Sequence, residues 1–253
     1  MTIARTCGVQ LGYEWRSFRR NPAAATFTVA FPLVLLLVVG SLTVDATSAP
    51  AGGRFEQFFV PAVAAFAVMS ACYTNLAMTL VLRRDSGLLK QARTTPVPAT
   101  VLVGGLVVHQ LLIAMALGGA TLAIGTAAYG LDRPGDPLIV LVTMVVGAGS
   151  FSAMALAIVA LLPNADAAPA VVNGVFFPVV IASGLLFPVR PGSLLASFSE
   201  LLPVRHFLLG MHDAYSPVTG NGPATLTHLV VMLAWGLAAA VVVRFRFQWE
   251  TRT

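Results

Sequence analysis

The sequence predicts an all-α integral membrane protein with six transmembrane helices. Of its 253 residues, 57% are hydrophobic and only 10% are charged, whereas a soluble domain usually carries about 25% charged residues. With so few polar groups, lipid must be the solvent for much of the surface. Six apolar stretches reach the ~20 residues that a helix needs to cross the hydrocarbon core. None contains Lys, Arg, Asp or Glu: Ala23–Leu42, Phe58–Leu82, Val97–Tyr129, Leu138–Leu162, Ala167–Phe187 and Thr225–Val243.

A single transmembrane domain is expected over residues 1–253, because the chain has no room for a large soluble domain as well. Its predicted parts are an amphipathic segment (1–22), spans one to five (23–187), an external connection (188–224), the sixth span (225–243) and a tail (244–253).

Basic residues are divided unequally between the two ends of the predicted spans. With six spans both termini lie on one side, and that side holds eleven Lys and Arg residues against four on the other. Lys and Arg are enriched in cytoplasmic loops. We therefore expect a multi-pass protein of a bacterial plasma membrane with both termini in the cytoplasm. The net charge of +5 reflects this topology and gives no reason to invoke nucleic acid.

The segment before the first span is amphipathic. On a helix, one face carries Cys7, Leu11, Trp15 and Phe18, and the other side carries Gln10, Arg16, Ser17 and Arg20. Such a helix can lie in the cytoplasmic interface with its tryptophan at headgroup depth. An interfacial anchor and a mechanical role beside a partner protein both fit this segment.

The connection between the fifth and sixth spans contains two short apolar segments separated by Pro203. Apolar segments of about 10–14 residues are more often re-entrant or interfacial than spanning. We expect two short re-entrant helices that dip into the outer leaflet, with a loosely packed extracellular loop as the alternative. His206, His212 and Asp213 lie close together here, but the two histidines do not share a helical face. We therefore expect them to form hydrogen bonds rather than a metal site.

The loop RRDSGLLKQARTTPVP, residues 83–98, holds the chain's only lysine and carries strong helix punctuation. Gly87 can end the second span, since glycine adopts the left-handed conformation that terminates helices. Leu88 and Leu89 then form an apolar ridge, and threonine caps with Pro96 can start the next helix. We expect a short transverse helix joined rigidly to two spans. A solvated loop would need the basic charge but not this order of residues.

Three stretches together resemble a known family over nearly the whole chain. They are EWRSFRRNP (14–22), the loop 83–98, and SGLLFP (183–188) followed by LLPVRHFLLGM (201–211). These are similar to the membrane subunits of ATP-binding-cassette exporters of the type-2 permease class, including antibiotic and multidrug resistance permeases. Many relatives have Thr-Leu-Glu where this chain has Leu88-Leu89-Lys90, and the basic version resembles the drug-exporter branch.

The resemblance implies that the loop contains a coupling helix, which docks into a groove on a separate ATPase subunit. The residues it assigns to that interface are Arg84, Asp85, Gly87, Leu88, Leu89, Lys90 and Arg93. It also implies a connecting helix beside the loop, with Leu11, Glu14, Trp15 and Phe18. Two permease copies, as a homo- or heterodimer, would join two ATPase subunits. We expect no catalytic residue, cofactor or metal on this chain, which has no Gly-Lys-Ser/Thr Walker pattern; ATP and Mg²⁺ would bind the partner.

The absence of charge within the spans fits export of a hydrophobic or amphipathic compound, such as a drug, a lipid or a glycan-linked molecule. Asn75, His109 and Asn173 could line its path or form bonds between helices. An ion-coupled carrier is the first alternative, although such carriers usually place an ionisable side chain near the midplane. A membrane-embedded hydrolase that uses Ser150 or Ser152 with His109 is the second, although no G-x-S-x-G elbow occurs.

Overall fold

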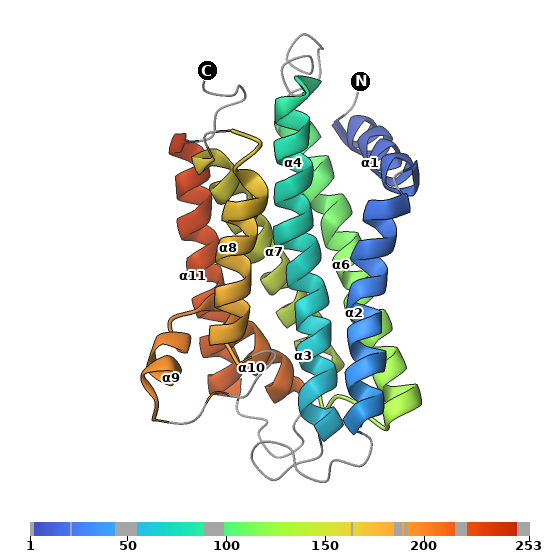
Figure 1. Ribbon diagram of the computed structural model, residues 1–253, viewed down its shortest axis with the longest axis vertical. Coiled ribbons are helices and arrows are strands. Elements are labelled where there is room, and N and C mark those ends of the chain that lie inside the picture. Colours follow the sequence, from blue (N-terminus) through green and yellow to red (C-terminus); the bar gives the residue numbers. More distant parts are fainter. Residues whose placement is uncertain are drawn as a thin grey trace.

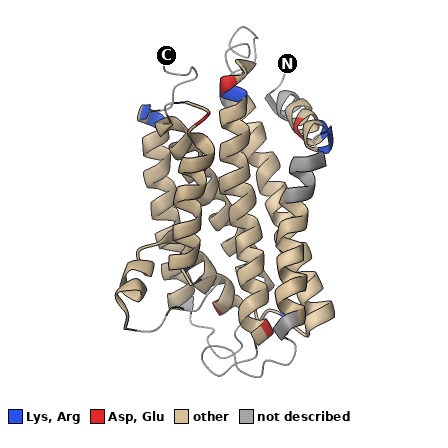
Figure 2. Cartoon of the chain, viewed as in Figure 1, with Lys and Arg blue, Asp and Glu red and all other residues tan. Residues whose placement is uncertain are grey.

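The computed structural model describes residues 3–20, 22–43, 55–88, 99–162, 164–184, 189, 192–215 and 222–246, and every regular element among them is a helix. The long helices run side by side, and both termini lie at the same end of the bundle (Figure 1). Charged residues lie toward the two ends of the helices, with arginines visible in blue on α1 and at the ends of α4 and α11 (Figure 2).

A helix occupies each of the six predicted spans, and the all-α membrane fold is confirmed. The helices are α2 (Pro22–Thr43), the continuous α3–η1–α4 (Phe55–Met69, Ser70–Asn75 and Leu76–Asp85), α6 (Ala99–Tyr129), α7 (Pro137–Leu161), α8 (Ala168–Ala182) and α11 (Gly222–Arg246). Within the described residues, four helices are long and apolar enough to cross a membrane, at 55–85, 101–129, 137–161 and 224–246, while α2 and α8 contribute shorter apolar stretches. The predicted ends at 97–98 and 185–187 lie outside the described residues.

The second span is the centre of the bundle. Its most apolar window is 67% buried within the chain, against 11% for the window of α11, so α11 leaves most of its surface to lipid or to another protein. The span is also irregular, because Ser70–Asn75 forms a π-helical segment between α3 and α4. Single π turns inside α-helices occur frequently at functional sites, and this one ends at Asn75.

Small residues allow the helices to approach closely, as is common in membrane bundles. A Cβ atom added at Gly125 of α6 would lie 2.2 Å from Val60 of α3, and one at Gly236 of α11 would lie 3.0 Å from the Ser150 hydroxyl oxygen of α7. Ser150 therefore packs against α11. This contact favours helix packing over a hydrolytic role for this serine.

The two short helices predicted before the last span are α9 (Leu194–Ser199) and α10 (Pro203–Tyr215). The hydroxyl of Ser193 accepts a hydrogen bond from the Ala196 amide and caps α9, and Pro203 occupies the favoured first position of α10. Both helices lie at the end of the bundle opposite the termini (Figure 1).

The two short helices differ in what their apolar side chains contact. Leu194 and Phe198 of α9 are exposed, whereas Phe207 and Met211 of α10 are fully buried. The Phe207 ring lies against Gly147 of α7, where an added Cβ would approach it to 2.5 Å. Only α9 therefore presents an apolar face outward, and α10 is anchored in the bundle.

Candidate functional site

The amino-terminal helix α1 (Ile3–Arg20) is joined to the second span by a buried ion pair. Both guanidinium Nη atoms of Arg83 bond the carboxylate of Glu14, at 2.6 Å from Nη1 to Oε1 and 2.5 Å from Nη2 to Oε2. The Gln10 side-chain amide also donates to Glu14 Oε1, at 2.7 Å. Only 2% of the Glu14 side chain is exposed, against 17% for Arg83. Paired N–H···O bonds of this kind are stronger and more directional than a single-point contact.

The orientation of α1 differs in part from the sequence prediction. Arg16 and Arg20 are exposed as predicted, but Gln10 packs against Gly105 of α6 and Ser17 lines a pocket with α4 and α6, both half-buried, and Trp15 is half exposed. The prediction for Gln10 and Ser17 was wrong because it sorted side chains by polarity alone. In the structure, the side of α1 that carries Glu14 is buried because Glu14 forms an ion pair inside the bundle.

Close approach of α1 to α6 depends on Gly105. A Cβ atom at this position would lie 2.4 Å from Cγ of Gln10 and 3.2 Å from its Cβ. The adjacent Gly104 has no atom within 4 Å of its Cβ position. The contact between α1 and α6 therefore requires glycine at position 105 but not at position 104, which makes Gly104 a matched control.

We expect Gly105→Val to displace α1 from α6 and to lower the free energy of unfolding by about 1–3 kcal/mol, as overpacking does. Distances between spin labels on α1 and α6 would show the displacement. Gly104→Val should leave the distances and the stability unchanged. Equal behaviour of the two variants would contradict the close contact.

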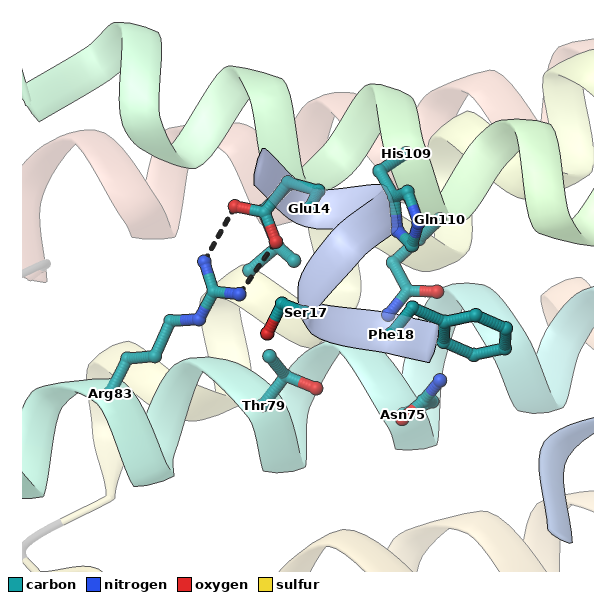
Figure 3. A pocket seen from close by; sticks show the side chains of 9 residues that line it. Glu14, Ser17, Phe18, Asn75, Thr79, Arg83, His109 and Gln110 are labelled. Carbon is teal, nitrogen blue, oxygen red and sulfur yellow. Dashed lines mark hydrogen bonds and ion pairs between the residues drawn. The ribbon is translucent and has the colours of Figure 1, made fainter. Parts of the chain in front are cut away.

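A pocket of about 90 Å³ lies between α1, α4 and α6 beside the ion pair. Figure 3 shows its polar side chains converging from the three helices. The lining residues are Glu14, Ser17, Phe18, Asn75, Thr79, Arg83, Leu106, His109 and Gln110. Both ring nitrogens of His109 and Oε1 of Gln110 are buried without a hydrogen-bond partner among the described residues. The pocket thus combines one ion pair with several uncharged hydrogen-bonding groups.

An aromatic cluster closes one side of this pocket. The ring of His109 lies edge-on to Phe18 and Trp15 of α1, with centroids 5.7 and 6.2 Å away. His109 is therefore packed against the connecting segment as well as bordering the pocket. Of the three predicted path residues, His109 and Asn75 meet here, whereas Asn173 lies on α8 and is not among the pocket's lining.

Arg84 is directed away from the predicted partner interface. Only 6% of this residue is exposed, and its guanidinium donates to the carbonyl oxygens of Val159 and Leu162, at 2.9 and 3.1 Å. These carbonyls close the C-terminal end of α7, where cationic side chains bond orphan acceptors and complement the helix dipole. Arg84 thus connects α4 to α7, which differs from its predicted place at the ATPase.

The beginning of the predicted coupling segment is exposed. Asp85 is exposed, 46% of Leu88 is accessible, and Gly87 has φ +72°, the left-handed conformation that was expected to end the second span. Leu89, Lys90 and Arg93 lie outside the described residues.

The ion pair between α1 and the second span is the main feature that sequence reasoning missed. Glu14 was placed on the connecting helix and Arg83 was counted only as a positive-inside charge. A signal was available, since Glu14 is the only acidic residue in Ile3–Arg20. A single carboxylate in an otherwise basic helix, close to a basic loop, indicates that it pairs with a basic side chain of the same protein.

One comparison with known proteins identifies a family. The family model described as ABC-2 type transporter matches residues 7–215, which includes most of α1, the first five spans and both short helices. A search of curated proteins finds no match.

Proposed function

Because the chain belongs to the ABC-2 type transporter family, we propose that it is the membrane subunit of an exporter driven by a separate ATPase. The observation that carries this proposal is how the end of α4 is anchored just before the loop that follows it. The last two side chains before its exposed start, Arg83 and Arg84, bind α1 on one side and the end of α7 on the other. A helix end held in this way can transmit a push on the following loop to both neighbouring helices.

In this mechanism a partner ATPase binds the exposed segment that begins near Asp85 and includes Gly87 and Leu88. ATP and Mg²⁺ bind to the partner, and its closure pushes on the segment. The push reaches α1 through the bidentate ion pair and α7 through the carbonyl contacts of Arg84. Rigid elements that move as units are the usual means of such transitions.

The arrangement in the membrane follows from charge. The start of α1, the end of α4 and the end of α11 lie at one end of the bundle (Figure 1), and eleven Lys and Arg belong to that end by sequence. The positive-inside rule supports a cytoplasmic location for this end, and we propose that the membrane is a bacterial plasma membrane. Two permease copies and two ATPases form the complex, and the exposed α11 is available for contact with lipid or another subunit.

The transported compound is hydrophobic or amphipathic under this proposal. Asn75 and His109 give the pocket between α1, α4 and α6 hydrogen-bonding groups without a free charge. Such a lining accepts the polar end of an amphiphile while its apolar part stays in lipid. Stimulation of ATPase activity by lipids or amphiphilic drugs, measured on the purified complex in liposomes, tests this point; no stimulation by either class would contradict it.

Replacing Leu88 by aspartate should uncouple the two subunits. The side chain is largely exposed, so the substitution leaves folding and membrane insertion intact but places a charge on the apolar ridge. We expect substrate-stimulated ATP hydrolysis and transport to fall at least about tenfold, the effect of losing ~1.4 kcal/mol of binding. Leu88→Met should retain both activities.

The same experiment distinguishes the main alternative. An ion-coupled carrier would transport without an ATPase and would tolerate Leu88→Asp. Wild-type transport by Leu88→Asp, or transport by the purified chain alone under an ion gradient, would overturn the proposed function.

A further inference from the structure

A chain of polar side chains links α10 to α11 at the end opposite the termini. Nδ1 of His206 on α10 lies 2.9 Å from Nδ1 of His228 on α11. Nε2 of His206 lies 2.8 Å from the carbonyl oxygen of Glu200. Nε2 of His228 lies 3.6 Å from Oδ2 of Asp213, which also accepts a hydrogen bond from Thr225 Oγ1 at 3.4 Å.

The tautomers of the two histidines follow from these contacts. A carbonyl oxygen only accepts, so Nε2 of His206 must carry a hydrogen. The two facing Nδ1 atoms must share one hydrogen. Without a hydrogen between them, two lone pairs would face each other, and with one hydrogen on each atom the two hydrogens would clash. Nε2 of His228 then faces the carboxylate of Asp213, and this contact is attractive only if one further proton lies on the histidine pair or on Asp213.

The number of protons that the arrangement accepts is therefore one. With one proton beyond two neutral imidazoles and an ionised carboxylate, the three groups have no net charge and each contact is favourable. Without that proton, a lone pair of His228 faces the negative charge of Asp213. If a second proton also lies on the imidazoles, both Nδ1 atoms carry hydrogen and the contact between His206 and His228 breaks.

We propose that His206, His228 and Asp213 form a binding site for a single proton, and that occupancy of this site holds α10 against α11. The protons of such closely coupled groups belong to the unit and not to one residue. Both acidification and alkalinisation should then loosen the contact. This site is independent of the proposed export function.

Charges on the surrounding elements support single occupancy. Arg205 of α10, whose Nη1 bonds the Ser183 carbonyl oxygen at 3.3 Å, adds positive charge and opposes a second proton. Burial raises the pKa of the Asp213 carboxyl, which favours keeping the first. From α3, Glu56 lies in the first turn, and α7 contributes no ionisable side chain.

The remaining histidine of α10 is a matched control. His212 stacks on Phe58 of α3 with ring centroids 4.8 Å apart. Burial, with a smaller contribution from Arg205, lowers the pKa of His212 to about 4, so this ring stays neutral between about pH 5 and 9. It therefore does not exchange protons where the pair does.

The loosening should be local. Phe207 of α10 is buried against Gly147 of α7, and the Ala214 carbonyl oxygen accepts a bond from the Gly135 amide at 3.0 Å. These contacts hold α10 to the bundle independently of the proton. Hydrogen exchange should therefore rise at residues 203–206 and 224–230 while the buried middle of α10 stays protected.

Nitrogen-15 NMR of histidine-labelled full-length chain in lipid nanodiscs tests the proposal, since the chain has only four histidines. In the wild type we expect a coupling across the hydrogen bond between Nδ1 of His206 and Nδ1 of His228, and joint titration of the two rings. Asp213→Asn removes the carboxylate that faces Nε2 of His228, so the joint change of the two rings should move to lower pH, the effect of removing an opposite charge. His212→Gln should change neither.

Independent titration of His206 and His228 in the wild type, without coupling between their Nδ1 atoms, would overturn the site. So would an unchanged joint change of the two rings with pH in a folded Asp213→Asn variant. The wild-type measurement decides the question if that variant does not fold. Because no readout involves ATP or transport, failure here is distinct from failure of the proposed function.

Discussion

Arg84→Met is expected to lower the free energy of unfolding by about 3 kcal/mol, because it removes two charge-assisted bonds of about 1.5–3 kcal/mol each and returns part of that as apolar burial. The guanidinium is buried and bonds the carbonyl oxygens of Val159 and Leu162. Methionine fills a similar volume but donates no hydrogen bond, so these carbonyls lose their cationic partner. Denaturant unfolding in bilayers, followed by tryptophan fluorescence, would measure the loss.

Arg246→Met provides the control for this substitution. Arg246 is exposed in the last turn of α11, so its replacement removes the same charge without breaking a buried contact and should change stability by less than about 0.5 kcal/mol. If the two variants were equally stable, Arg84 would not be the group that secures the end of α7.

The fold could be predicted from sequence because lipid imposes strong rules. A spanning helix must be apolar for about 20 residues, and the charge-free stretches such as Leu138–Leu162 agree with α7 to within a residue at each end. The helix pair around Pro203 was predicted for a similar reason, since its apolar spacing is helical but too short to cross. Local chemistry also predicted the left-handed glycine, Gly87, that follows the end of α4 at Asp85.

The partners of individual charged side chains could not be predicted in the same way. Arg83 and Arg84 are adjacent in sequence and carry the same charge, yet one binds α1 and the other α7. Their directions depend on the 100° rotation between successive helical residues and on which helices flank α4. Hydropathy predicts the length of a helix but not its neighbours. Arg83 was therefore interpreted only as a cytoplasmic basic charge, and Arg84 as a contact of the ATPase.

The π-helical segment is a further feature that periodicity does not reveal. The segment Ser70–Asn75 mixes small, apolar and polar residues. Nothing in this composition indicates the extra residue per turn of a π-helix. It nevertheless bears on the pocket, because it changes the helical phase between the buried face of α3 and the lining residues Asn75 and Thr79.

Removal of either partner in the Glu14–Arg83 pair should have unequal costs. Arg83→Ala leaves a carboxylate that is only 2% exposed, and breaking a buried pair costs about 3–5 kcal/mol. Glu14→Ala leaves an arginine that is 17% exposed and can reach water with its charged end. We therefore expect a loss of about 1–2 kcal/mol for Glu14→Ala, and a larger one for Arg83→Ala.

The double variant Glu14→Ala/Arg83→Ala separates the pair from its surroundings. Because neither charge is then left alone, it should be more stable than Arg83→Ala, with a coupling energy of about 2 kcal/mol in the cycle. Arg83→Lys should lie between wild type and Arg83→Ala, since an ammonium group cannot make the bidentate contact. Additive losses in the cycle would show that the two side chains act separately. The ion pair would then not be the route by which a push on the loop reaches α1.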